Sequence, residues 1–290
     1  MPPAPPGVLD APLPPAMAAK ASDLGVSKAG LATTQTFVLA VLAGAFIALG
    51  AMFATVVTAG AGDVPFGIAR LAAGVVFSLG LLLVVAAGAE LFTGNNLIVM
   101  AWADRRISLG GVARNWAIVY LGNMVGAVAT AALVYAAGQY KFGDGAIGLS
   151  ALAIANTKTG LGWGQAVALG VLCNALVCLA VWLSYSARTL TDKFFAVLLP
   201  ISAFVAAGFE HSIANMYFLP LGLFVKSGAS DAFWHTTGAA AGDYGNLTWS
   251  AAAFDNIVPV TIGNIFGGAV MVGLVYWLVY RRPARDEARG

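Results

Sequence analysis

The chain has 290 residues, of which 60% are hydrophobic and 10% are charged, and its formal net charge is +2. Soluble domains carry about 25% charged residues, so this composition excludes an ordinary soluble protein and favours a protein embedded in a lipid bilayer. The small net charge gives no basis for a nucleic-acid partner.

The first residues precede any hydrophobic stretch long enough to span a membrane. Residues 1–16 are rich in Pro and Ala and contain no Lys or Arg, which excludes a signal peptide and predicts a disordered cytoplasmic tail. Residues 17–34 combine apolar positions with Lys20 and Lys28. This pattern is typical of an amino-terminal segment at the membrane interface, and a solvated linker is the alternative.

Six hydrophobic units follow. Because about 20 apolar residues span a bilayer, we predict that residues 35–282 form an all-α transmembrane domain of six helices. The units cover residues 35–60, 66–103, 115–137, 165–185, 194–225 and 252–280. Polar residues interrupt the second unit near 90–96 and the fifth near 210–215. Residues 283–290 are expected to form a second cytoplasmic tail.

The basic residues predict the orientation, because the cytoplasmic flanks of membrane helices collect Lys and Arg. Eleven of the 15 basic residues fall on the side that holds both ends of the chain. The other side carries four, which are Arg70, Lys141, Lys158 and Lys226. Both termini are therefore expected in the cytoplasm, which requires an even number of spans.

Three short motifs occur in the same order in the first three and the last three units. They are Ala-Val-x-x-Gly at 40–44 and 166–170, Gly-x-Glu-x4-Asn at 88–95 and 208–215, and Gly-Asn-x-x-Gly at 122–126 and 263–267. Each repeat contains three spans, so the second copy enters the membrane from the opposite face. The sequence thus predicts two inverted three-helix repeats, with the permeant site near the interrupted second and fifth helices.

Glu90 and Glu210 place an ionisable group in apolar surroundings at the two interruptions. Such groups at membrane depth indicate functional sites by default. The alternative, which we favour for these two residues, is that they cap free backbone amides of the broken helices. The asparagines of the repeated motifs are assigned the same structural role, and they are Asn95, Asn215, Asn123 and Asn264.

His211 is one of two histidines, and the other, His235, lies in a predicted external loop. A histidine on a broken membrane helix indicates a functional group, and a satisfied core residue is the alternative. Cys173 and Cys178 would point about 140° apart on a helix, which favours a structural role. No further His or Cys accompanies His211, so we expect no metal site and no cofactor.

Four strings resemble signatures of the formate/nitrite transporter family. Residues 209–216 (Phe-Glu-His-Ser-Ile-Ala-Asn-Met) resemble its fifth helix, and 90–94 (Glu-Leu-Phe-Thr-Gly) resemble its second-helix loop. Residues 173–182 and 256–265 resemble its fourth and sixth helices. The resemblance implies an aquaporin-like protomer with its own pore, a homopentamer, and transport of formate or a similar small monovalent anion. It also implies a bacterial cytoplasmic (inner) membrane protein whose amino-terminal segment covers the pore and responds to pH.

The resemblance also implies residue roles. His211 would be the central pore histidine, faced by Thr93 and supported, together with the lysine region, by Asn174. Lys158 would attract the anion on the external side. Apolar constrictions on either side of the histidine would be formed by Phe77, Leu81, Leu91, Val177 and Phe204. From spacing alone, Phe77 and Leu81 share one helix face, for which ordinary packing is the alternative.

Formate is almost wholly ionised near neutral pH, and a bare anion faces a large desolvation cost in an apolar constriction. Two mechanisms remain open. In one, His211 exchanges a proton with formate, which crosses as the neutral acid; in the other, His211 only donates a hydrogen bond to an anion that crosses charged. The expected partners are formate, protons, membrane lipid and further copies of the chain.

Other functions are weighed against this one. A nitrite or hydrosulfide channel is the alternative within the same family. A membrane enzyme is disfavoured because no nucleophile, metal cluster or nucleotide loop accompanies His211. A water or glycerol channel is disfavoured because the sequence contains no paired Asn-Pro-Ala loops.

Overall fold

The structure is a computed structural model that describes residues 11–282, and within that range all regular elements are helices. The α-helices are α1 (Pro14–Ala29), α2 (Thr33–Thr58), α3 (Phe66–Ala87), α4 (Val99–Ala103), α5 (Leu109–Ala136), α6 (Ala146–Thr159), α7 (Trp163–Ser186), α8 (Leu190–Ala206), α9 (Ser212–Gly228), α10 (Asp231–Thr237), α11 (Val258–Ile265) and α12 (Val275–Tyr280). Short 3-10 helices occupy Ala61–Asp63, Gly94–Ile98, Gln139–Lys141 and Ala241–Tyr244, and π-helical turns occupy Ala251–Ile257 and Phe266–Leu274.

Five of the six predicted spans contain one helix that is long enough to cross a membrane on its own. The helices α2, α3, α5, α7 and the continuous helical stretch Ala251–Tyr280 are each long and apolar enough to cross a membrane. The fifth hydrophobic unit is divided into α8 and α9, which have 17 residues each. A helix of that length measures about 25 Å and is shorter than the hydrocarbon core of a bilayer. The fifth unit is therefore a broken helix.

Both breaks begin with a glycine in the left-handed conformation. Gly88 (φ 80°) follows α3, and Gly208 (φ 76°) lies just after α8, a conformation that glycine adopts without steric cost. The first break lies where the sequence predicts it. The second lies earlier than predicted, because α8 ends at Ala206 and α9 already begins at Ser212. Asn215 is thus in a helix rather than in the break.

The amino-terminal helix α1 begins inside the segment that was expected to be a disordered tail. That expectation is wrong for residues 14–16, because α1 starts at Pro14 and proline is well tolerated in the first turn of a helix. The helix also has a packing partner, since Met17 and Ala18 are buried against Trp182 and Met100. Residues 1–10 and the predicted tail at 283–290 lie outside the described residues.

The repeat is visible in the close contacts between helices, with one correction. A Cβ added to Gly126 would meet the carbonyl oxygen of Val41, and one added to Gly267 would meet that of Val171. The two glycines of the third motif therefore make equivalent contacts. Val41 corresponds to Val171 and not to Val167, so the predicted alignment of the first motif is wrong by one helical turn.

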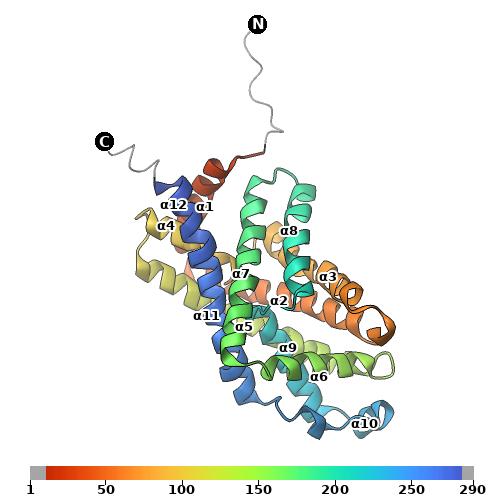
Figure 1. The fold of residues 1–290 in the computed structure, drawn as a ribbon. Coiled ribbons are helices and arrows are strands. Elements are labelled where there is room, and N and C mark those ends of the chain that lie inside the picture. The colour runs from red at the N-terminus through yellow and green to blue at the C-terminus, as the bar shows by residue number, and fades with distance from the viewer. Residues whose placement is uncertain (1–10, 283–290) are drawn as a thin grey trace, which may run out of the picture.

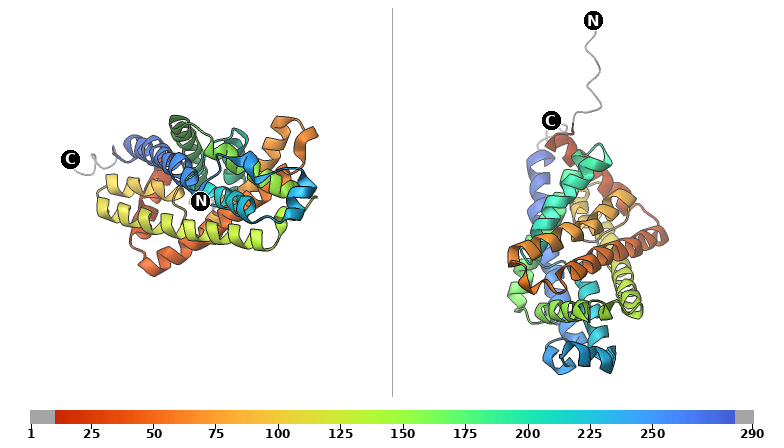
Figure 2. Two further views of the ribbon diagram at one scale, coloured as in Figure 1. Left: turned by 90° about the horizontal axis from the view of Figure 1, so that it is seen from below. Right: turned by 90° about the vertical axis from the view of Figure 1, so that its right-hand side faces the viewer.

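Different helices lie at the two ends of the molecule. Helices α1, α4 and α12 lie together at one end, and α10 lies at the opposite end (Figure 1). The right-hand view of Figure 2 shows the same separation along the long axis of the molecule. The first and last described helices are thus on one side, as an even number of spans requires.

Candidate functional site

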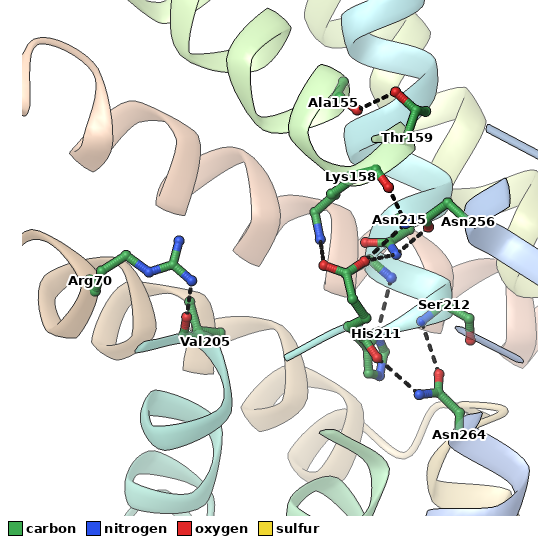
Figure 3. Close-up of polar contacts among 12 residues, drawn as sticks. Arg70, Ala155, Lys158, Thr159, Val205, His211, Ser212, Asn215, Asn256 and Asn264 are labelled. Atoms are coloured by element: carbon green, nitrogen blue, oxygen red, sulfur yellow. Dashed lines mark hydrogen bonds and ion pairs between the residues drawn. The ribbon is translucent and has the colours of Figure 1, made fainter. Parts of the chain in front are cut away.

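Two asparagines hold the backbone of the two breaks. The Oδ1 atom of Asn123 accepts a hydrogen bond from the amide of Phe92 at 2.9 Å, and its Nδ2 donates to the carbonyl of Glu90 at 2.9 Å. Asn264 does the same for the amide of Ser212 at 2.9 Å and the carbonyl of Glu210 at 3.0 Å (Figure 3). A primary amide suits this position because it offers a donor and an acceptor together.

The glutamates have a different role from the predicted one. Glu90 forms an ion pair with Lys28 at 2.5 Å, and Glu210 forms one with Lys158 at 2.7 Å. Their second oxygens accept from Asn95 and Asn215, both at 2.7 Å. In the described part of the chain neither carboxylate accepts from a backbone amide, so the expectation that they cap the breaks is wrong. Each glutamate is instead neutralised by a lysine.

Lys28 is a site residue that the sequence analysis missed. It lies in the last turn of α1, as Lys158 lies in the last turn of α6. A fourth repeated motif, Lys-x-Gly-Leu-x3-Gln at 28–35 and 158–165, carries this equivalence. The signal was present, but Lys28 was assigned to the membrane interface because its partner Glu90 is far away in the sequence.

His211 is held between the two breaks. Its Nε2 lies 2.9 Å from Oγ1 of Thr93, as the predicted pairing requires, and its Nδ1 accepts a hydrogen bond from the amide of Ala214 at 3.0 Å. The imidazole thereby caps the amino-terminal end of α9. Because Nδ1 is an acceptor, the ring proton of the neutral imidazole lies on Nε2 and points at Thr93.

Asn174 supports the threonine side of this pair. Its Nδ2 donates to the carbonyl oxygens of Thr93 at 3.3 Å and Asn264 at 2.7 Å. Among the described residues it forms no hydrogen bond with Lys158, so the predicted contact with the lysine region is not made. The thiol of Cys178 also donates to the Thr93 carbonyl, at 3.3 Å.

Two cavities lie on either side of the Thr93–His211 pair. The Lys158 cavity has a volume of about 350 Å³, and its walls include Lys158, Arg70 and His211. The Lys28 cavity has a volume of about 400 Å³, and its walls include Lys28 and Glu90. Of the five predicted constriction residues, all of them buried, Phe77 and Phe204 line the Lys158 cavity, Leu81 and Leu91 line the Lys28 cavity, and Val177 lines neither.

The aromatic residues narrow the Lys158 cavity next to the histidine. The ring centroids of Phe77 and Phe204 lie 5.5 Å apart in an edge-to-face arrangement, which is a favourable geometry for aromatic rings. The Phe204 ring also stacks on the imidazole of His211, with centroids 5.9 Å apart. An anion approaching His211 from Lys158 would therefore leave a charged cavity and meet apolar rings.

Comparison with known proteins agrees with this geometry. The family model described as "Formate/nitrite transporter" matches residues 15–278. The "Formate channel FocA" of Escherichia coli (strain K12) is 48% identical over 270 residues, which cover 93% of this chain and 95% of that protein. The "Formate channel FocA" of Haemophilus influenzae is 41% identical, with 88% of this chain and 89% of that protein covered.

Solved structures are similar over nearly their whole length. One described as "Pentameric formate channel with formate bound" has a TM-score of 0.82 and 46% identity, and the match covers 86% of this chain and 97% of that one. An "FNT family ion channel" has a TM-score of 0.76 and 29% identity, with 91% and 98% covered. The chain belongs to the formate/nitrite transporter family.

Proposed function

We propose that this protein is a homopentameric channel that passes formate through a pore in each protomer. The observation that carries the proposal is the arrangement of two lysine-bearing cavities that end on either side of the buried Thr93–His211 pair. Relatives and a solved structure named as formate channels support the choice of formate. The description of that structure as pentameric supports the assembly.

The distribution of basic residues supports a location in the bacterial cytoplasmic membrane with both termini inside. Of the 13 basic residues within residues 11–282, nine fall on the side that holds α1 and α12, as cytoplasmic flanks do. The Lys28 cavity then opens towards the cytoplasm, and the Lys158 cavity opens outwards. A lysine at each mouth concentrates a small anion before it meets the apolar constriction.

The hydrogen bonds of His211 favour donation over proton exchange. Its Nδ1 is occupied by the amide of Ala214, so a second ring proton would require breaking the cap of α9. The Nε2–H group donates to Thr93, whose hydroxyl proton has no acceptor among the described side chains and remains available to the anion. Such a chain of donors polarises its members. Formate thus crosses as an anion that Thr93 and His211 stabilise.

The function is tested by measuring flux into liposomes of formate, nitrite, hydrosulfide and glycerol side by side. Formate should pass at a higher rate than nitrite and hydrosulfide, and glycerol should not pass, because it carries no charge for the lysines to attract. A preference for nitrite or hydrosulfide would assign the protein to another function of the same family. Glycerol flux equal to that of formate would contradict an anion channel.

A further inference from the structure

The wall of the Lys158 cavity contains a second basic residue, Arg70. Arg70 takes no part in the ion pair between Lys158 and Glu210. Arg70 lies in the first turns of α3 and its side chain is half-buried in the cavity wall. Its Nη2 donates to the carbonyl of Val205 at 2.5 Å and its Nε to that of Ala206 at 3.3 Å. The guanidinium thus rests on the carboxyl-terminal end of α8, at the break that leads to His211 (Figure 3).

These two hydrogen bonds use only one edge of the guanidinium. Nε and one N–H of Nη2 face the carbonyl oxygens, so the edge formed by Nη1 and the second N–H of Nη2 has no partner among the described residues. A carboxylate fits such an edge with two parallel hydrogen bonds. The glycine at position 208 leaves room for this placement, because a Cβ there would lie 3.3 Å from Nη2.

Arg70 also changes the charge of the cavity. Lys158 is 2.7 Å from Glu210, so these two charges compensate each other. Arg70 is within ion-pair distance of no carboxylate in residues 11–282, and it gives the Lys158 cavity one positive charge in excess. The charged walls of the Lys28 cavity are Lys28 and Glu90, which compensate each other without such an excess.

The internal repeat shows that this difference in charge between the two cavities arises from a difference in sequence between the two repeats. Gly88 corresponds to Gly208 at the two breaks, and the same offset relates Arg70 to Leu190. Leu190 is exposed at the start of α8 and does not line the Lys28 cavity. Among the described residues, the guanidinium therefore has no equivalent in the walls of the Lys28 cavity.

We infer that Arg70 forms a binding subsite for planar two-oxygen anions at the outer mouth of the pore, which makes the outer side bind formate more tightly than the inner side. The inference rests on the proposed function. Formate accepts two hydrogen bonds from the unoccupied edge of the guanidinium, and it then passes to Lys158 and the Thr93–His211 pair. An anion with a single acceptor atom, such as hydrosulfide, benefits from the charge of Arg70 but not from the planar arrangement of its donors.

The test uses Arg70→Lys, which keeps the charge and removes the fork, and Arg70→Gln, which removes both. Influx of formate and of hydrosulfide is measured at low ionic strength in right-side-out and inside-out membrane vesicles. The matched control is Arg114→Lys, because Arg114 also donates to a backbone carbonyl, that of Leu31, but lines neither cavity. Thermal unfolding of each variant measures any structural role of the α8 contact.

In Arg70→Lys the half-saturating formate concentration from the outer side should rise about tenfold, as expected for the loss of a charge-assisted bidentate contact. It should stay unchanged for hydrosulfide and for formate from the inner side, and the maximal rate should not fall. In Arg70→Gln the half-saturating concentrations of formate and of hydrosulfide, both measured from the outer side, should rise. Arg114→Lys should match the wild type.

Two results would overturn the inference while formate flux itself persists. One is an Arg70→Lys channel whose outer half-saturation for formate equals that of the wild type. The other is a maximal rate that falls equally from both sides, which would leave Arg70 as a cap of α8 and nothing more. Absence of formate flux in the wild type would instead defeat the proposed function.

Discussion

The paired lysines and glutamates explain how an anion path tolerates two buried carboxylates. An unpaired glutamate in either cavity would repel formate. Removing one member of a buried ion pair is costly, because the other charge is left buried without a partner. Glu90 and Glu210 are both buried, and each is bound by one lysine and at least one asparagine. The lysines therefore act on the path in two ways, because they attract the permeant anion and neutralise a fixed one.

Removing Lys158 alone should reveal both effects. In Lys158→Ala the half-saturating formate concentration from the outer side should rise about tenfold at low ionic strength, because the attraction is lost and Glu210 is left uncompensated. Lys158→Ala combined with Glu210→Gln should recover part of the loss. Lys141→Ala serves as the control, because Lys141 is exposed on the same side and lines neither cavity. A double variant no better than the single one would contradict the compensating role of Lys158.

His211→Asn and His211→Phe separate hydrogen-bond donation from proton exchange. Asparagine is a favoured helix N-cap and keeps a donor, whereas phenylalanine loses both and should cost about 1 kcal/mol of stability at the start of α9. Formate flux measured in proteoliposomes should therefore persist in the Asn variant and fall by at least about a hundredfold in the Phe variant. Equal loss of flux in the two variants, with both pentamers intact, would favour proton exchange.

At the scale of the elements, α1 is fixed to the membrane domain by Asp104. This carboxylate follows α4, outside the membrane-spanning helices, and accepts hydrogen bonds from Ser22 of α1 at 2.6 Å and Trp277 of α12 at 2.8 Å. Arg281 forms an ion pair with it at 2.9 Å. Burial raises the pKa of Asp104, but the bonds from Ser22, Trp277 and Arg281 outweigh burial and hold the pKa below its ordinary value.

A lowered pKa in the folded state means that ionised Asp104 stabilises the fold above its unfolded pKa, and that this contribution is lost as the pH falls through the folded value. Asp104→Asn should therefore lower Tm by about 2–4 °C at neutral pH. The difference from the wild type should be constant between pH 8 and 5 and shrink below about pH 4. Asp23→Asn is the control, because its ion pair with Arg106 is exposed. A difference that changes between pH 5 and 8 would contradict this assignment.

The long helices were predictable because hydrophobicity alone defines them. The residues at which they begin and end were harder to predict. The third span was predicted from 115, but α5 begins at Leu109, where the side chain of Ser108 accepts from the amide of Gly111 and caps the first turn. Helix α6 was not predicted, because its sequence at 146–159 is less apolar than the spans and falls between the third and fourth predicted units. Packing against α9 and not composition stabilises such an element.

The site was predictable where residues lie in one motif and not where distant segments meet. Thr93 and His211 were paired through the family resemblance, and the structure places their side chains 2.9 Å apart. The ion pairs Lys28–Glu90 and Lys158–Glu210 join residues 62 and 52 positions apart. No periodicity indicates such a contact, because only the packing of α1 and α6 across the breaks creates it.

At the scale of the whole molecule, the proposed assembly has a direct test. Native mass spectrometry in mild detergent should give the mass of five chains of 29.6 kDa each. Each protomer contains both cavities and the Thr93–His211 pair, so the axis of the pentamer needs no substrate pore. A stable monomer or trimer under the same conditions would contradict the assembly.

The central claim is that formate crosses each protomer as an anion stabilised by the Thr93–His211 pair. The most direct test measures formate flux and electrical current together in proteoliposomes at neutral pH. Because Nδ1 of His211 is occupied by the amide of Ala214, the account predicts that about one elementary charge moves with each formate and that no protons follow it. Electroneutral formate flux accompanied by proton uptake would contradict the account.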